Sequence, residues 1–141
     1  MRVPAGNGRP RKPFRGAPAA GKPENMSDCL FCKIRDGLIP AKVVYRDDVC
    51  VAFEDINPQA PTHVLFIPHK HIPTVNDITT EDRELVGHLF IAAAKVAQER
   101  GHADPSDGYR VVMNTHAHAG QTVFHIHLHL LAGRPLGWPP G

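Results

Sequence analysis

Three histidines alternate with apolar residues near the C-terminus, at His125, His127 and His129. Side chains at positions i, i+2 and i+4 of a β-strand share one face. A strand over His125–Leu131 would therefore present three imidazoles in a row, with neighbours about 6.5–7 Å apart. The residues between them would face the other side of the strand and pack under a helix. These apolar residues are Ile126, Leu128 and Leu130.

Three interpretations fit a row of imidazoles: a solvated polar face, a metal site and phosphate chemistry. Neutral imidazole is a common metal ligand, but alternating histidines usually need a further ligand from elsewhere in the chain. Imidazole is also a nucleophile near neutral pH, and neighbouring imidazoles can hydrogen-bond phosphoryl oxygens. The segment Gly120-Gln121-Thr122 lies directly upstream and can turn backbone N–H groups toward an anion. The presence of this segment favours the third interpretation, phosphate chemistry.

The elements that would hold these residues follow from capping, periodicity and turn signals. Together they predict an α+β domain with a mainly antiparallel sheet of about five strands, one long helix and one short helix. The short helix is expected over Cys29–Arg35, capped by Ser27 or Asp28. The long helix should begin near Thr79 or Thr80 and stop at Gly101. The remaining strands are expected at Val43–Tyr45, Val49–Glu54, Val64–Ile67 and Tyr109–Asn114, with a polar loop at His116–Gly120.

The charge of the chain is unevenly spread. The net charge is +2, but residues 1–25 hold six basic groups and one acidic group, which leaves −3 for the rest. With five prolines and four glycines, residues 1–25 cannot bury enough apolar surface to order themselves, so we expect a disordered basic tail. A weak polyanion-binding role for this tail is the alternative. Residues 26–141 form the expected domain, mildly acidic, without a nucleic-acid footprint and without a run long enough to span a membrane.

The chain has three cysteines, at Cys29, Cys32 and Cys50. An odd number that includes a C-x-x-C pair does not indicate a secreted disulfide framework, so we expect a cytoplasmic protein. The pair could bind zinc with two further ligands, or could be two half-buried thiols without metal. Cys50 lies between two valines and is expected to be a small core residue.

The segment His125–Leu131 has the pattern H-φ-H-φ-H-φ-φ, where φ is apolar, and resembles the signature of the histidine-triad (HIT) superfamily. The resemblance covers residues 27–141. Further segments are similar to the Hint branch, the histidine-triad nucleotide-binding proteins. They are Ile39–Lys42, Phe53–Ile56, Pro58–His63 and Gly133–Gly141.

This resemblance implies a homodimeric purine nucleoside phosphoramidase, which cleaves the P–N bond of AMP–amine conjugates and requires no cofactor for catalysis. His127 would be the nucleophile and would form a nucleotidyl-imidazole intermediate that water hydrolyses. His125 and His129 would hydrogen-bond phosphate oxygens, and His63 would support the triad. Asp55 would accept the ribose hydroxyls.

The resemblance also implies the remaining nucleotide contacts. Taken alone, Asp55 is a turn carboxylate, His63 a core histidine and Trp138 a surface residue, and only the joint pattern favours functional roles. Trp138 would reach the partner subunit's site. The α-phosphate and leaving group would lie near Asn114, Gly120, Gln121 and Thr122, and the base would lie against Leu30, Phe31, Ile34, Phe53 and Ile56.

Some histidine-triad proteins bind zinc through such a cysteine pair and two histidines. Here the resemblance implies a structural zinc held by Cys29, Cys32, His63 and His125, while His69 and His71 are expected to be exposed. Two rival functions remain open. The first is a dinucleoside polyphosphate hydrolase, which shares Gln121–Val123 but not the Trp138–Gly141 end. The second is a nucleotide-binding interaction module with little turnover.

Overall fold

The computed structural model describes residues 28–141, so the tail expected at residues 1–25 lies outside the described part. The described residues form two compact units. We call residues 41–68, 83–112 and 127–141 the sheet unit, and residues 28–40, 69–82 and 113–126 the cysteine unit. The alternating histidines are divided between them. His125 belongs to the cysteine unit, whereas His127 and His129 belong to the sheet unit.

The sheet unit is built on five antiparallel strands in the order β1-β2-β3-β5-β4, which confirms the expected fold class. The central strand β3 is buried along its whole length, because it pairs on both sides and carries a continuous apolar run. The strands are β1 (Val43–Arg46), β2 (Cys50–Glu54), β3 (Thr62–Pro68), β4 (Tyr109–Val112) and β5 (Leu128–Ala132).

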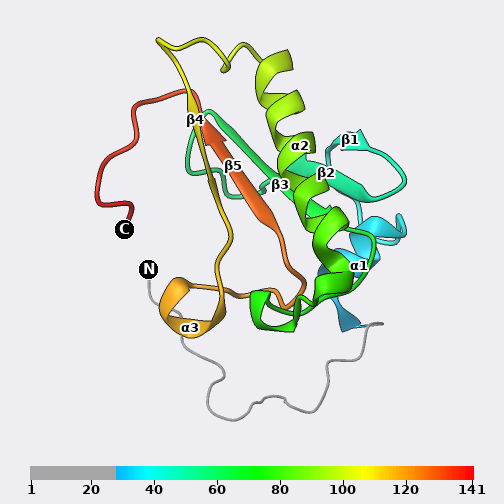
Figure 1. Cartoon of the computed structure of the whole chain (residues 1–141). Coiled ribbons are helices and arrows are strands. Elements are labelled where there is room, and N and C mark those ends of the chain that lie inside the picture. The colour runs from blue at the N-terminus through cyan, green and yellow to red at the C-terminus, as the bar shows by residue number, and fades with distance from the viewer. Residues whose placement is uncertain (1–27) are drawn as a thin grey trace. The chain divides into compact units, whose positions relative to one another are not determined.

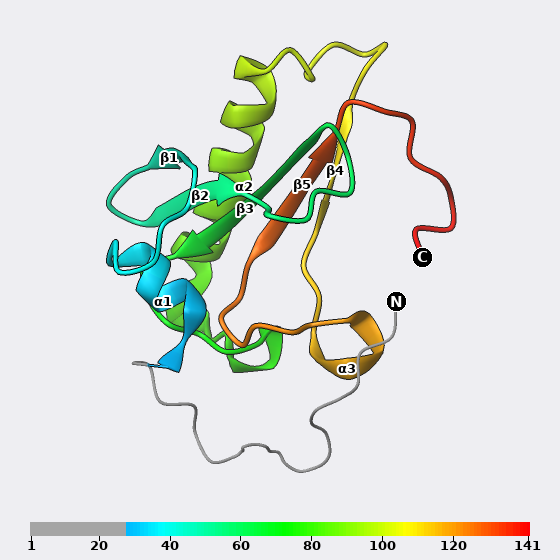
Figure 2. The same ribbon diagram turned by 180° about the vertical axis from the view of Figure 1, so that it is seen from behind.

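The long helix α2 (Arg83–Glu99) covers one face of the sheet, in front of it in Figure 1 and behind it in Figure 2. Its buried residues recur at helical spacing and pack on β3 and β5. Gly101 follows the helix at φ +85°, as the sequence predicts for a stop. No helix among the described residues is both long and apolar enough to cross a membrane.

The last strand begins at Leu128 rather than at the predicted His125. On β3, Phe66 pairs with Leu128, and the strand ends two residues later at Pro68, which has no N–H to extend the ladder. The Ile126 N–H donates instead to the Ile72 carbonyl at 2.7 Å. The prediction of three imidazoles on one strand face is therefore wrong, since only His129 lies on β5.

The cysteine unit contains two short helices. Helix α1 (Leu30–Arg35) is capped by Cys29, whose Sγ accepts from the Cys32 N–H at 3.3 Å. This corrects the expected cap at Asp28, while the other candidate, Ser27, lies outside the described residues. Helix α3 (His116–Ala119) replaces the expected loop, since four residues are too few to show a helical period. Two 3-10 turns, Val75–Asp77 and Thr80–Asp82, complete the unit.

The second of these turns begins at a capping box. The Thr79 hydroxyl accepts from the Glu81 N–H at 3.3 Å, and the Asp82 carboxylate accepts from the Thr79 N–H at 2.9 Å. The predicted cap at Thr79 is therefore present, although it starts a 3-10 turn that leads along the chain into α2.

Candidate functional site

Two histidines of the sheet unit face each other from adjacent strands. Nε2 of His63 on β3 lies 2.9 Å from Nδ1 of His129 on β5. The Gln59 N–H donates to the other nitrogen of His63, Nδ1, at 3.0 Å. A carboxylate oxygen of Asp55 lies 3.3 Å from His63 Nε2. His63 is therefore held on both ring nitrogens.

These contacts fix which nitrogens carry protons. A backbone N–H can only donate, so His63 Nδ1 must accept and its proton must sit on Nε2. That N–H donates to His129 Nδ1, which leaves the proton of His129 on Nε2. Burial lowers the pKa of His63, and burial together with the charges of His127 and His63 lowers the pKa of His129 to about 4. Both imidazoles are therefore neutral near pH 7.

His127 lies beside this pair. Its ring centroid is 5.0 Å from that of His129, and its side chain is 8% exposed. A neutral imidazole so placed combines a nucleophilic nitrogen with a neighbouring N–H donor that is already oriented. This arrangement suits nucleophilic chemistry at a centre where negative charge develops.

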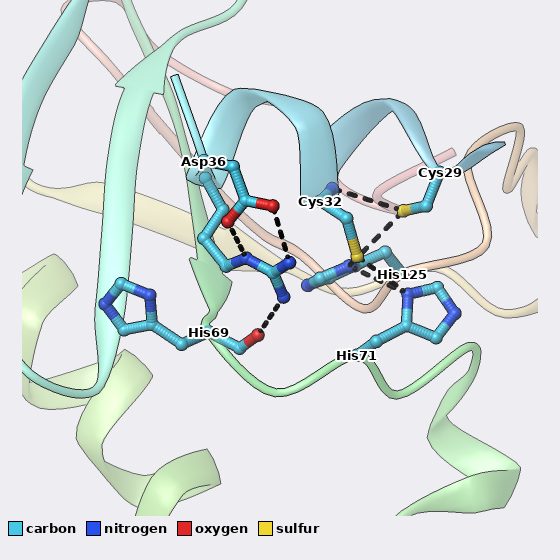
Figure 3. A network of polar contacts seen from close by, with 7 residues as sticks. Cys29, Cys32, Asp36, His69, His71 and His125 are labelled. Atoms are coloured by element: carbon cyan, nitrogen blue, oxygen red, sulfur yellow. Dashed lines mark hydrogen bonds and ion pairs between the residues drawn. The ribbon is translucent and has the colours of Figure 1, made fainter. Parts of the chain in front are cut away.

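His125 lies in a different cluster, with Cys29 at the N-cap of α1, Cys32 within α1, and His71 (Figure 3). His125 Nδ1 lies 3.4 Å from Cys29 Sγ, 3.6 Å from Cys32 Sγ and 3.2 Å from His71 Nδ1. Cys32 Sγ lies 3.3 Å from His71 Nδ1. All four ligand atoms lie within 4.8 Å of one another, and Cys29, Cys32 and His125 are buried.

These distances match the edges of a zinc tetrahedron. Zn–S bonds of about 2.3 Å and Zn–N bonds of about 2.0–2.1 Å place N and N about 3.3 Å apart, and S and N about 3.5–3.6 Å apart. Two thiols and two imidazoles also form a donor set that zinc prefers. The residues therefore fit a four-coordinate zinc ion that leaves no position open for substrate.

The cluster with the two cysteines and His125 contains His71, where His63 was expected. The expected ligand set is wrong at this position because both nitrogens of His63 are engaged in the sheet unit, with Gln59 and His129. The expectation that His71 is exposed is also wrong, since it is only partly exposed. The alternation of His69 and His71 directly after β3 was the available signal.

The residues expected around the phosphate lie in the cysteine unit. Gln121 is 3% exposed, and its side chain organises the loop. Its carbonyl accepts from the His116 N–H at 2.9 Å, and its amide donates to the Pro73 and Val123 carbonyls at 2.8 and 3.2 Å. A direct phosphate contact would need one of these bonds to break. Gly120 ends α3 at φ +85°, Thr122 is exposed and Asn114 is partly exposed.

The residues expected around the base belong to both units. In the cysteine unit, Phe31 and Ile34 are buried and Leu30 is 42% exposed. In the sheet unit, Phe53 is buried and Ile56 is 99% exposed. Trp138 is 83% exposed, with the Arg110 guanidinium 6.0 Å from its ring centroid. Their contacts with a nucleotide remain predictions.

A further group of polar residues joins the β1–β2 turn to α2 within the sheet unit. The Asp47 carboxylate accepts hydrogen bonds from the Tyr45 hydroxyl at 2.7 Å and from His88 at 2.6 Å, as well as from two backbone N–H groups. Burial and the neighbouring Asp47 raise the pKa of the Cys50 thiol to about 12, so it stays protonated. Cys50 is fully buried, as expected for a core residue. Hydrogen bonding accounts for this group without a metal.

Comparison with known proteins gives consistent results. The family model of the HIT domain matches residues 36–136. The chain is 53% identical over 110 residues to the purine nucleoside phosphoramidase of Escherichia coli, an alignment that covers 78% of this chain and 91% of that protein. It is also 53% identical over 114 residues to an uncharacterised HIT-like protein of Synechocystis, covering 81% of this chain and 97% of that protein.

Solved structures agree with these relatives. The structure of a HIT family hydrolase from Legionella pneumophila matches with a TM-score of 0.78 and 54% identity, over 81% of this chain and all of that chain. A histidine triad protein from Clostridium difficile matches with a TM-score of 0.75 and 44% identity, over 81% of this chain and 96% of that chain.

The antiparallel sheet, the alternating histidines and these matches define a histidine-triad hydrolase. The chain belongs to the HIT domain family, as its motif predicts.

Proposed function

We propose that this hydrolase cleaves the P–N bond of purine nucleoside 5′-phosphoramidates. The similarity to the Escherichia coli purine nucleoside phosphoramidase supports this substrate class. The observation that carries the proposal is the neutral His63–His129 pair beside the buried His127, with a 2.9 Å contact that orients the donor next to the proposed nucleophile.

In the proposed reaction, an imidazole nitrogen of His127 attacks the α-phosphorus and forms a P–N bond to the enzyme. The bond to the leaving nitrogen breaks, and this nitrogen takes up a proton from solvent and departs as the amine. Water then attacks the same phosphorus and gives up a proton to solvent, the bond to His127 breaks, and the 5′-mononucleotide is released. The His129 Nε2–H would donate to a phosphate oxygen as negative charge develops there. No step requires a metal.

The other roles come from the family resemblance and are part of the proposal. His125 would hydrogen-bond a phosphate oxygen, His63 would orient His129, and Asp55 would accept the ribose hydroxyls. Because the Asp55 carboxylate also accepts from the Asn57 N–H at 2.8 Å, its position is fixed before a nucleotide binds. The phosphate would lie near Asn114, Gly120, Gln121 and Thr122, and the base near Leu30, Phe31, Ile34, Phe53 and Ile56.

The test mixes purified protein with an AMP–lysine-type phosphoramidate and, separately, with diadenosine polyphosphate. We expect AMP release from the first, its loss in His127→Asn, and a nucleotidyl adduct on the wild type after rapid alkaline quenching and mass spectrometry. His88→Asn removes an imidazole of the same unit outside the proposed machinery and should keep activity. Preferred cleavage of diadenosine polyphosphate would favour the rival hydrolase. No turnover of either compound would favour a binding module.

We also propose that a zinc ion is held by Cys29, Cys32, His71 and His125. The tetrahedral match of their ligand atoms supports this site. A zinc ion with four protein ligands is structural and cross-links the segments that carry them. A reducing cytoplasm would keep both thiols available as ligands, in agreement with the proposed cytoplasmic location.

A homodimer completes the proposal. The exposed face of α2 carries Phe90 and Ile91, 48% and 68% exposed, one turn from the small residues Gly87 and Ala94. An apolar helix stripe with small neighbours suits close packing against a second copy. Sedimentation velocity of the wild type and of Ile91→Glu tests this: a dimer that becomes a monomer supports it, and a monomeric wild type contradicts it.

A further inference from the structure

Arg134 reaches from the end of β5 to the loop between β2 and β3. Its Nε and Nη2 donate to the Gln59 carbonyl oxygen, at 3.3 and 3.0 Å. Its third nitrogen, Nη1, donates to the Pro135 carbonyl at 3.0 Å. A planar guanidinium that holds two carbonyls has little freedom to rotate, so the carbonyl of residue 59 is fixed relative to the chain beyond β5.

The two segments also meet closely beside this contact. Thr62 pairs with Ala132 at the end of the ladder, and Gly133 follows at φ +100°. A Cβ on Gly133 would lie 2.7 Å from the Pro61 side chain, so only glycine allows this approach. The loop ahead of β3 is therefore held by a backbone ladder, a close contact and the guanidinium of Arg134.

Gln59 connects the Arg134 contacts to the His63–His129 pair. Its carbonyl accepts from Arg134, while its N–H donates to His63 Nδ1 at 3.0 Å. The Gln59 side-chain amide donates to the Asn57 carbonyl at 3.0 Å, which holds the loop from within. Fixing the Gln59 backbone on both sides of its Cα keeps the N–H aimed at His63.

We infer that Arg134 is a positioning residue of this hydrolase, which acts through Gln59 to set the tautomers of His63 and His129. With the Gln59 N–H directed at Nδ1, His63 can carry its proton only on Nε2. His63 Nε2–H then donates to His129 Nδ1, which leaves the His129 Nε2–H as a donor for the reacting phosphate. The same N–H also excludes a doubly protonated His63, because two donors would face each other at Nδ1.

The position of Asp55 agrees with this order of protons. Its carboxylate oxygen lies 3.3 Å from His63 Nε2, and a carboxylate oxygen accepts hydrogen bonds. Both neighbours of Nε2, Asp55 and His129, are therefore acceptors, while the neighbour of Nδ1 is a donor. The groups on both sides of the His63 ring therefore favour the same tautomer, with the proton on Nε2.

The first test needs no substrate. Protein labelled with 15N at histidine is examined by NMR, which distinguishes a protonated from an unprotonated ring nitrogen. In the wild type, we expect unprotonated Nδ1 and protonated Nε2 for both His63 and His129. In Arg134→Ala, the 15N shifts of both rings should move toward values averaged over two tautomers. Arg134→Lys keeps one donor nitrogen, so its 15N shifts should lie between those of the wild type and Arg134→Ala. Arg83→Ala removes an exposed arginine of α2 and should leave both rings unchanged.

The catalytic part of the inference rests on the proposed function. With an AMP–lysine-type phosphoramidate, Arg134→Ala should lower kcat about fivefold to tenfold, the loss expected for one typical hydrogen bond, with little change in KM. Arg134→Lys should restore part of this loss.

The two measurements separate failure of the inference from failure of the proposed function. Unchanged histidine shifts in a folded Arg134→Ala, or a wild-type His63 protonated on Nδ1, would overturn the inference whatever the substrate. If Arg134→Ala alters the histidine shifts but the wild type releases no AMP, the positioning role of Arg134 stands and the phosphoramidase proposal is refuted. A lower kcat in Arg134→Ala with unchanged shifts would also overturn the inference, because Arg134 would then act by another route.

Discussion

His71 and His125 direct their Nδ1 atoms at each other across 3.2 Å, with Cys32 Sγ within 3.6 Å of both. Two imidazole nitrogens and a thiol at such distances fit the zinc ion proposed above. Because His125 is followed two residues later by His127, a metal that fixes His125 would also restrain the backbone that leads to the proposed nucleophile.

Replacement of a thiol tests this metal site. We expect purified wild-type protein to hold about one zinc ion per chain, and Cys32→Ser to hold much less. Loss of the cross-link should lower Tm by about 5–10 °C, because a ligand that binds only the folded state stabilises it. Cys50→Ala removes a buried thiol outside the site and should keep the zinc. Equal zinc contents in Cys32→Ser and wild type, by atomic emission, would contradict the assignment.

Removal of His63 tests its support of His129. In His63→Gln the buried partner of His129 Nδ1 is lost, and the orientation of the donor with it. We expect kcat for the phosphoramidate to fall about tenfold to a hundredfold, with KM changed less than threefold or so, since the substrate itself loses no contact. His88→Gln serves as the matched histidine control. A raised KM at constant kcat would instead place His63 in ground-state binding.

Much of this arrangement follows from the sequence, and the exceptions have local causes. The helical spacing of apolar residues predicts α2. The short apolar run Val64–Ile67, closed by Pro68, predicts β3. The strand expected at His125 fails because alternation alone does not show where the neighbouring strand ends, here at Pro68. The place of His71 beside Cys32 and His125 was not predicted, because these partners lie 39 and 54 residues away along the chain and local sequence patterns do not report such contacts.

Asp55 should govern the choice between ribonucleotides and deoxyribonucleotides. In Asp55→Asn, the side-chain oxygen can still accept from the Asn57 N–H, so the turn should persist. The neutral amide accepts ribose hydroxyl bonds more weakly than a carboxylate. We expect kcat/KM for an adenosine phosphoramidate to fall about tenfold, and that for its 2′-deoxy analogue to fall less. Parallel losses on both substrates would show that Asp55 does not read the ribose.

Acid should destabilise the protein through its neutral histidines. Unfolded His129 takes up a proton near its ordinary pKa of 6.5, whereas folded His129 stays neutral down to about 4. Between these two pH values the unfolded chain binds more protons. The free energy of unfolding should therefore fall with decreasing pH, by up to about 1.4 kcal/mol per pH unit. Urea unfolding at several pH values measures this slope. It should be shallower in His129→Asn, and an identical slope would contradict the assignment.

The close approach of Gly133 to Pro61 can be separated from backbone strain by a matched pair of glycines. Gly133 and Gly108 have similar positive φ values, +100° and +105°, but a Cβ on Gly108 would meet nothing within 4 Å. Gly108→Ala should therefore cost only the left-handed strain, about 1 kcal/mol. Gly133→Ala should cost that strain plus the clash with the proline ring, a total of about 2–4 kcal/mol. Because the clash would push apart the segments that Arg134 joins, Gly133→Ala should also disturb the 15N shifts of His63, whereas Gly108→Ala should not. Equal losses of unfolding free energy in the two variants would show that the contact between Gly133 and Pro61 adds no steric cost.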